Sequence, residues 1–291
     1  DASAEKDHVS LFDIDNAFVQ ALIDSDVFVR LPASWRTDAN DSGVRKLVRA
    51  LYGLPQAPRL WAKHYEKGIA KLGWIQSGSR GLWRKESKKF PGKFLKLGVY
   101  VDDNIATGPC KIELEAEVQA ILQVFPGKII QPENMPHNWL RYDILGTDVW
   151  YRRATGELRI TMERYIEKIA EKFRMKGCNT EKVTSPTFNE ANLYDETSKK
   201  CDYPLREVIG CLSWAALICR IDIANPVNVL SRASSREPTK AIVACCKKVL
   251  KFLIATPKVG LYYSPESERL FNSTYAELRS GGGPAKTWNT F

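Results

Sequence analysis

The stretch Tyr100-Val101-Asp102-Asp103 decides which fold and which functional site the sequence predicts. It follows the alternating apolar segment Phe94 to Val99 and precedes a second short apolar piece, Ile105 to Gly108, so the pattern predicts a β-hairpin with a tight turn. The turn carries two adjacent carboxylates, whose charge some cation must offset. Asp and Asn are also ordinary turn residues, because their side chains bond the local backbone. The stretch alone therefore leaves a site and a plain turn as open alternatives.

The composition indicates a folded, basic chain. The 291 residues suffice for one large domain or two to three small ones, and the 44% hydrophobic content supports a core. A formal charge of +9 suits a polyanionic partner such as nucleic acid. The seven cysteines are odd in number and show no Cys-x-x-Cys spacing, so neither a disulfide framework nor a zinc site is indicated, and a reducing compartment fits best. We see no signal peptide or membrane-spanning run, so we expect neither secretion nor a membrane partner.

The order of elements predicts an α+β fold, with an antiparallel sheet covered by helices on one face. In the first half we expect strands at 8–13, 27–31, 44–48, 82–83 and 94–101, and helices at 58–72 and 111–125. In the second half we expect a hairpin of 145–150 with 157–160, a helix at 162–173, loops at 178–200, helices at 205–217, 222–231 and 240–254, and a strand at 259–263. The glycine-rich residues 280–284 predict a linker.

Three motifs occur in one order along the chain. They are Asp13-Ile14-Asp15-Asn16-Ala17-Phe18, then Leu51-Tyr52-Gly53-Leu54-Pro55-Gln56-Ala57-Pro58-Arg59-Leu60-Trp61, then Tyr100-Val101-Asp102-Asp103. Together they resemble the reverse transcriptase of copia-type LTR retrotransposons (Pseudoviridae), and the similarity continues at 145–149, 164–166 and 203–232. The resemblance implies a right-hand polymerase with a palm and partial fingers over 1–150, a thumb-like region over 151–200, and a connection-like helical region over 201–291 that ends before ribonuclease H.

The resemblance also implies an activity. It is RNA-directed and DNA-directed DNA polymerisation, in which a nucleotide is transferred from a dNTP to the 3′-hydroxyl of a primer on an RNA or DNA template. Such a transfer uses two metal ions, and Mg²⁺ prefers carboxylate oxygens. By resemblance, Asp13, Asp102 and Asp103 are the catalytic residues and the ligands of Mg²⁺, with Mn²⁺ as the alternative ion. Asp103 is either a ligand or only a neighbour, and Asp15 is expected in solvent or behind the ligands.

The remaining site residues follow from the same resemblance. The incoming nucleotide is expected to contact Ala17, Phe18 and Gln56. Phe18 would lie under the sugar, where a 2′-hydroxyl would clash, and a plain core role is its alternative. The primer and template are expected to contact Tyr100, Val101, Gly146, Arg152 and Lys168. Lys128 is expected either to donate a proton to pyrophosphate or to lie in solvent.

Several departures from the family pattern keep other interpretations open. The chain begins at Asp1 rather than Met, and only twelve residues precede Asp13, where the family has a fingers segment that supplies Lys and Arg for the triphosphate. Pro226 falls inside an expected helix, at a cost of about 3 kcal/mol unless the helix breaks. The alternatives are a non-catalytic relic or truncated fragment that at most binds nucleic acid, and a metal-dependent nuclease. By resemblance, the parent is a polyprotein with integrase and ribonuclease H, in cytoplasmic virus-like particles or in the nucleus.

Overall fold

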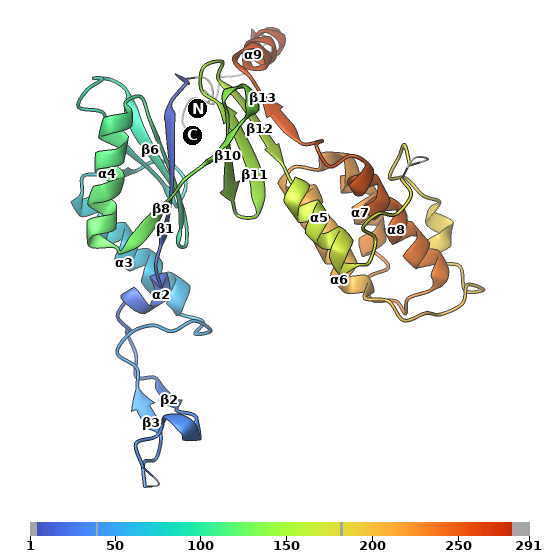
Figure 1. Ribbon diagram of the computed structural model, residues 1–291, viewed down its shortest axis with the longest axis horizontal. Helices are drawn as coiled ribbons and strands as arrows, with labels where there is room; N and C mark the ends of the chain where they lie inside the picture. Colours follow the sequence, from blue (N-terminus) through green and yellow to red (C-terminus); the bar gives the residue numbers. More distant parts are fainter. Residues whose placement is uncertain (1–4, 39, 181–182, 281–291) are drawn as a thin grey trace. The chain divides into compact units, whose positions relative to one another are not determined.

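The computed structural model describes residues 5–38, 40–180 and 183–280 (Figure 1). The chain divides into two compact units, one of residues 1–131 with 272–291 and the other of residues 132–271. We call them unit 1 and unit 2. The predicted palm, thumb-like and connection-like regions, with limits at 150 and 200, stay a prediction. Most of the linker predicted over 280–284 lies outside the described residues, which end at Ser280.

Unit 1 is built on a six-stranded antiparallel sheet. In spatial order its strands are β4 (Ile75–Gln76), β5 (Leu82–Glu86), β6 (Phe94–Tyr100), β7 (Asp103–Gly108), β1 (His8–Ile14) and β8 (Gly127–Ile130). The hairpin predicted around Val101-Asp102 is confirmed, because β6 and β7 pair antiparallel with Tyr100 opposite Asp103. β1 lies between β7 and β8, so a strand from the first 14 residues is enclosed by two strands that come much later in the chain.

Two helices of unit 1, α3 (Ala57–Lys71) and α4 (Lys111–Val124), pack on one face of this sheet (Figure 1). The helix predicted over 58–72 is confirmed as α3, and its Trp61, Tyr65 and Ile69 side chains belong to the core, since each is at most 2% exposed. A short helix, α2 (Ala17–Gln20), follows β1, and a separate two-stranded sheet pairs β2 (Phe28–Arg30) with β3 (Val44–Lys46). A 3₁₀ turn, η1, spans Ala33–Trp35.

The tip of the β5–β6 hairpin is anchored to α4 by the side chain of Glu113. Ser87 Oγ donates to Glu113 Oε2 over 2.6 Å, and the Lys88 amide donates to Oε1 over 2.6 Å. Burial alone would raise the pKa of Glu113, but these hydrogen bonds outweigh it and lower the pKa below its usual value of 4.5. The carboxylate of Glu113 therefore ties the helix to the hairpin in its charged form.

Unit 2 combines an antiparallel sheet with a helical core. The sheet runs β13 (Leu261–Tyr263), β12 (Glu157–Thr161), β11 (Thr147–Arg152), β10 (Trp139–Ile144) and β9 (Glu133–Met135). The helices are α5 (Glu163–Lys172), α6 (Leu205–Ile218), α7 (Ala224–Ser231) and α8 (Lys240–Ala255), with 3₁₀ turns η2 (Pro136–Asn138), η3 (Glu190–Leu193) and η4 (Ile221–Ile223). A last helix, α9, spans Pro265–Ser280, and its residues from 272 onward belong to unit 1.

The mixed fold with antiparallel sheets agrees with the predicted class. The predicted hairpin around Thr155-Gly156 is confirmed as β11 and β12, whereas β8, β9 and β10 were not predicted. In the described part of the chain, each helix is too short or too polar to cross a bilayer. All seven cysteines are free thiols.

The expected penalty at Pro226 does not arise. The helix expected over 222–231 is broken, because η4 ends at Ile223 and α7 begins at Ala224. Pro226 is the third residue of α7, where a backbone N–H has no intrahelical partner, so its loss costs little. Just before this break, the fully buried guanidinium of Arg220 donates to both carboxylate oxygens of Asp222 over 3.0 and 2.8 Å and to the Thr256 carbonyl over 2.9 Å.

Candidate active site

The turn between β6 and β7 has a strained backbone. Val101 has a φ of 58°, a region that a β-branched side chain rarely adopts and that costs on the order of 1–3 kcal/mol. Such a conformation persists only where the surroundings hold it. Here the Val101 carbonyl accepts a hydrogen bond from Trp61 Nε1 over 2.7 Å, and the Asp102 carbonyl accepts from Asn104 Nδ2 over 2.6 Å. The amide of Ile14 in β1 also donates to the Asp102 carbonyl, over 3.1 Å.

The two parts of the predicted acidic site meet on neighbouring strands. Asp13 on β1 is the direct cross-strand partner of Asp103 on β7, and directly opposed residues in an antiparallel pair share a face. Phe12 and Asn104, one position away on the same two strands, are buried toward the helices. Asp13 and Asp103 therefore face away from α3 and α4, and Asp102 lies in the turn beside them.

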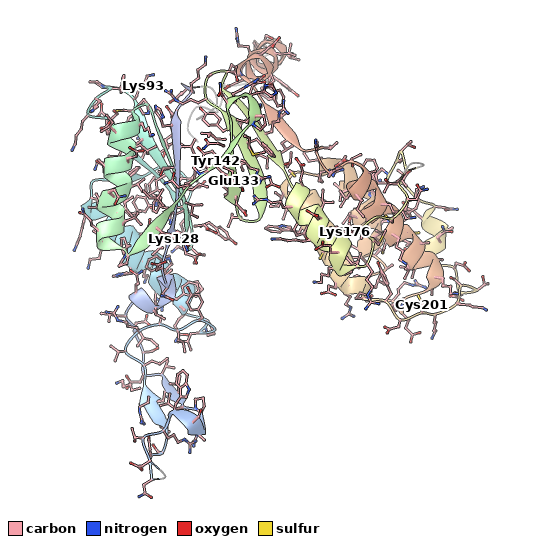
Figure 2. All side chains as sticks on the ribbon, in the orientation of Figure 1. Lys93, Lys128, Glu133, Tyr142, Lys176 and Cys201 are labelled. Carbon is pink, nitrogen blue, oxygen red and sulfur yellow. The ribbon has the colours of Figure 1, made fainter. Side chains whose placement is uncertain are left out.

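Lys128 completes this row of charges across three strands. It lies opposite Asp13 on β8, and its Nζ is 3.6 Å from Asp13 Oδ2 (Lys128 is labelled in Figure 2). The Lys128 side chain is 68% exposed and that of Asp13 is 27% exposed, so solvent screens the pair and leaves both groups accessible. Asp15 lies just beyond the strand and is exposed.

Gly127 allows β8 to approach Asp13. A Cβ at this position would lie 2.1 Å from the Asp13 carbonyl oxygen and 3.0 Å from Ile14 Cα. Only glycine fits such a close approach of two backbones. The Pro126-Gly127 pair ends helix α4 in sequence, and nothing in that pattern signals the second role of Gly127 beside Asp13.

A pocket of about 240 Å³ opens next to the turn. Phe18, Tyr100 and Val101 line it together with Trp61 and Tyr65 of α3. Phe18 is half-buried and also packs against the core and against Tyr52, with ring centroids 4.6 Å apart. Phe18 therefore packs against the core and also lines this pocket, and its expected place under the sugar stays a prediction.

The other predicted nucleotide contacts lie near this pocket along the chain. Ala17, before Phe18 in α2, is fully buried, so its side chain is not available to a ligand. Gln56 immediately precedes α3, is partly exposed, and is not part of the pocket lining.

Three predicted primer or template residues belong to unit 2. Gly146 has a φ of +75° in the β10–β11 turn, and nothing lies within 4 Å of the Cβ that another residue would place there. Arg152 on β11 pairs with Glu157 and stacks 4.9 Å from the Trp139 ring, so part of its charge is already offset. Lys168 on α5 is exposed.

The described residues contain no group of three or more His, Cys, Asp or Glu side chains placed to hold a metal ion. Asp13, Asp102 and Asp103 are close in the fold, but their carboxylates are not gathered into a complete ligand set. The structure thus supplies an acidic surface on rigid strands, with a lysine beside it.

The sequence is similar to known retroelement proteins. The family described as reverse transcriptase (RNA-dependent DNA polymerase) matches residues 2–188. The transposon Ty5-1 protein of Saccharomyces cerevisiae is 28% identical over 273 residues, which are 92% of this chain and 83% of that protein.

Two plant relatives are much longer than this chain. The Pol polyprotein from transposon TNT 1-94 of Nicotiana tabacum is 26% identical over 93% of this chain and 20% of its own length. The Pol polyprotein from transposon RE1 of Arabidopsis thaliana is 29% identical over 86% of this chain and 16% of its own length. The chain therefore spans most of the yeast protein and about a fifth or less of the plant polyproteins.

Proposed function

This chain belongs to the reverse transcriptase (RNA-dependent DNA polymerase) family, and from this premise we propose that it is a retrotransposon DNA polymerase that copies RNA and DNA templates. The observation that carries the proposal is the cross-strand pair of Asp13 and Asp103 beside the Asp102 turn. These acids come from distant parts of the sequence, yet they lie on the same face of the sheet, away from α3 and α4. Polymerisation needs carboxylates on such a surface, because a primer end and a triphosphate must both reach them.

The donor chemistry fits Mg²⁺ or Mn²⁺. Mg²⁺ at phosphate-transfer sites is usually held by one or two carboxylates together with substrate phosphates and water, rather than by a protein cage. Asp13, Asp102 and Asp103 supply such carboxylates, and the phosphates of the dNTP are expected to complete the ligand set. The bound ions would stabilise the charge on the attacking and leaving oxygens of the transfer.

The remaining residues orient substrates and protons around these carboxylates. The Lys128 side chain, 3.6 Å from Asp13, would reduce the repulsion that a triphosphate meets, and in this proposal it donates a proton to the leaving pyrophosphate. Phe18 follows Asp13 by five residues and is half-buried, and the proposal places its ring under the sugar of the incoming nucleotide, where it would exclude a 2′-hydroxyl. Tyr100 is 63% exposed, which suits contact with a primer end.

The partners follow from the charge and from the relatives. A formal charge of +9 favours binding of a primer–template duplex through its phosphates. The relatives include Pol and Gag-Pol polyproteins, so the proposal places the chain in a parent polyprotein with integrase and ribonuclease H, in cytoplasmic virus-like particles or in the nucleus.

Primer extension by the full chain tests the proposal. The reaction contains dNTPs, an RNA or DNA template with a primer, and Mg²⁺ or Mn²⁺, and it is run with Asp13→Asn, Asp102→Asn and the matched control Asp26→Asn, whose carboxylate pairs with Lys46 on the surface of the same unit. We expect extension by the wild type and by Asp26→Asn, and a loss of at least about 100-fold in the two site variants, because transition-state stabilisation is removed. Binding of primer–template should be equal in all four.

Two results would overturn the proposal. Wild-type protein that binds primer–template but extends nothing with either metal would favour the non-catalytic interpretation. Degradation of the primer instead of extension, lost in Asp102→Asn, would favour a nuclease.

A further inference from the structure

Three buried polar side chains connect helix α3 to the acidic turn. Trp61 Nε1 donates to the Val101 carbonyl, and Tyr65 Oη donates to Asn104 Oδ1 over 2.9 Å. Asn104 Nδ2 in turn donates to the Asp102 carbonyl over 2.6 Å. We call Trp61, Tyr65 and Asn104 the α3 tether.

The tether is polar where the surrounding core is apolar. Asn104 is 3% exposed and lies opposite Phe12 of β1, a position that an aliphatic residue would fill without any hydrogen-bond requirement. A buried amide is unfavourable unless its groups are bonded, and here both ends of the side chain are bonded. Burial also raises the pKa of Tyr65, so its hydroxyl remains a neutral donor. Packing alone does not explain why these groups point at the turn.

The bonds of the tether restrain both residues of the turn. The carbonyls of Val101 and Asp102 belong to successive peptide planes, and each accepts a hydrogen bond from the tether. The Asp102 carbonyl also accepts from the amide of Ile14, the residue that follows Asp13. The tether therefore keeps the strained turn against β1, where the Asp102 carbonyl accepts from the Ile14 amide.

We propose that Trp61, Tyr65 and Asn104 are positioning residues that set the placement of the Asp102 carboxylate relative to Asp13, and thereby the concentration of Mg²⁺ at which the site works. This inference rests on the proposed polymerase function for its metal readout. Its structural part, the restraint of the turn against β1, does not depend on activity.

The experiment compares Tyr65→Phe and Asn104→Leu with the wild-type full chain. Tyr65→Phe removes one hydroxyl at constant ring volume, and Asn104→Leu replaces the amide by an apolar side chain of similar size. The matched control is Tyr165→Phe, which removes a partly buried hydroxyl that bonds the Cys211 carbonyl over 3.0 Å in unit 2. Trp61→Phe is a third variant, and the other two remain informative if it does not fold.

Two quantities are measured. The first is hydrogen–deuterium exchange at the Ile14 amide and in residues 100–104, without substrate. The second is the half-saturating Mg²⁺ concentration in primer extension, together with kcat. We expect the tether variants to exchange about tenfold faster at Ile14 and to need about three to ten times more Mg²⁺, because Asn104→Leu removes the hydrogen bond to the Asp102 carbonyl and Tyr65→Phe removes the bond that orients the Asn104 amide. Tyr165→Phe should change neither quantity.

A double variant tests whether the residues of the α3 tether act as a unit. If the tether acts as a unit, adding Tyr65→Phe to Asn104→Leu should change Ile14 exchange little further, since contacting residues are not additive. The inference is wrong if Ile14 exchange in both single variants equals that of the wild type, or if Ile14 exchange rises while the Mg²⁺ requirement stays unchanged. A wild type that extends no primer would remove the proposed function, and the exchange measurement would still decide whether the tether restrains the turn.

Discussion

The substitution Gly127→Ala should damage both the stability of unit 1 and the acidic site. The new Cβ would lie 2.1 Å from the Asp13 carbonyl oxygen, whereas such contacts in proteins are essentially never shorter than 3.0 Å. The backbones of β1 and β8 must therefore part by about 0.9 Å next to Asp13. Because neither strand can rotate away without breaking its pairing, Asp13 itself is displaced.

The expected losses of stability and of activity follow from the size of this displacement. Overpacking in a well-ordered core costs about 1–3 kcal/mol, and each kcal/mol lowers the melting temperature of a unit of this size by about 2–4 °C. We therefore expect a melting temperature lower by about 2–12 °C. A misplacement near 1 Å at a reacting group costs up to about 100-fold in rate, so kcat in primer extension should fall by about 10- to 100-fold.

Two glycine variants in unit 2 separate stability from catalysis. Gly260→Ala creates an equally close contact, 2.0 Å from the Ile160 carbonyl oxygen, and should lower stability while the Mg²⁺ requirement of extension is unchanged. Gly210 lies in helix α6, and a Cβ at this position would have nothing within 4 Å. Gly210→Ala should therefore stabilise the protein by about 0.5–1 kcal/mol. Thermal unfolding and steady-state extension are measured for all three. The reasoning is refuted if Gly127→Ala keeps the melting temperature and kcat of the wild type.

Three further predictions address other parts of the molecule. Phe18→Val should raise incorporation of ribonucleotides relative to deoxynucleotides by about 10- to 100-fold, since the variant lacks the ring proposed to exclude a 2′-hydroxyl, and an unchanged ratio in competition assays would return Phe18 to a core role. The lowered pKa of Glu113 contributes stability that is present above pH 4.5 and is lost as the pH falls through the folded-state pKa. In Glu113→Gln, the denaturation midpoint should therefore fall less steeply as the pH is lowered, and an unchanged slope would contradict the bond to Ser87. Arg220→Met should destabilise unit 2 by about 2–4 kcal/mol in chemical denaturation, because Asp222 and the Thr256 carbonyl lose a buried partner, and a loss below about 0.5 kcal/mol would show that the pair is dispensable.

Much of the fold was predictable because its elements carry strong local patterns. The four-residue spacing of Trp61, Tyr65 and Ile69 predicts helix α3, and the alternation of apolar residues before Tyr100 predicts strand β6. β8 was not predictable in this way. Its four residues Gly127–Ile130 form a strand because they pair with β1, and a short apolar run after a Pro-Gly pair does not reveal such a partner.

β9 and β10 were missed for a related reason. The segment Trp139–Ile144 mixes arginine and aspartate with aromatic residues, so its alternation is weak. It is stabilised across strands instead, since the Arg141 guanidinium lies 5.4 Å from the Trp150 ring on β11. Such pairs become visible only when the register of the strands is known.

At the candidate site, the sequence patterns identified the acids at the strand ends. They did not identify the residues that bond or pack against the backbone of those acids. Asn104 resembled a turn residue and Trp61 a core residue, because a one-dimensional pattern does not show which carbonyl a donor reaches. The Pro126-Gly127 pair indicates the end of a helix and gives no sign of the close contact between Gly127 and Asp13. The assignment of Asp13, Asp102 and Asp103 to metal binding stays a prediction, which the Asp→Asn variants test.

The central place of β1 in its sheet has a consequence for synthesis of the chain. Ile14 pairs with Gly127, 113 positions later, and Asp13 pairs with Asp103. At about 5–20 residues per second on the ribosome, β1 waits roughly 6–23 s for its second partner. Such non-local pairing slows folding and leaves an apolar strand with two open edges until β7 is made, and with one open edge until β8 follows. The acidic surface is thus among the last parts of unit 1 to form, and nascent chains that stop before residue 127 are expected to aggregate rather than to carry a partial site.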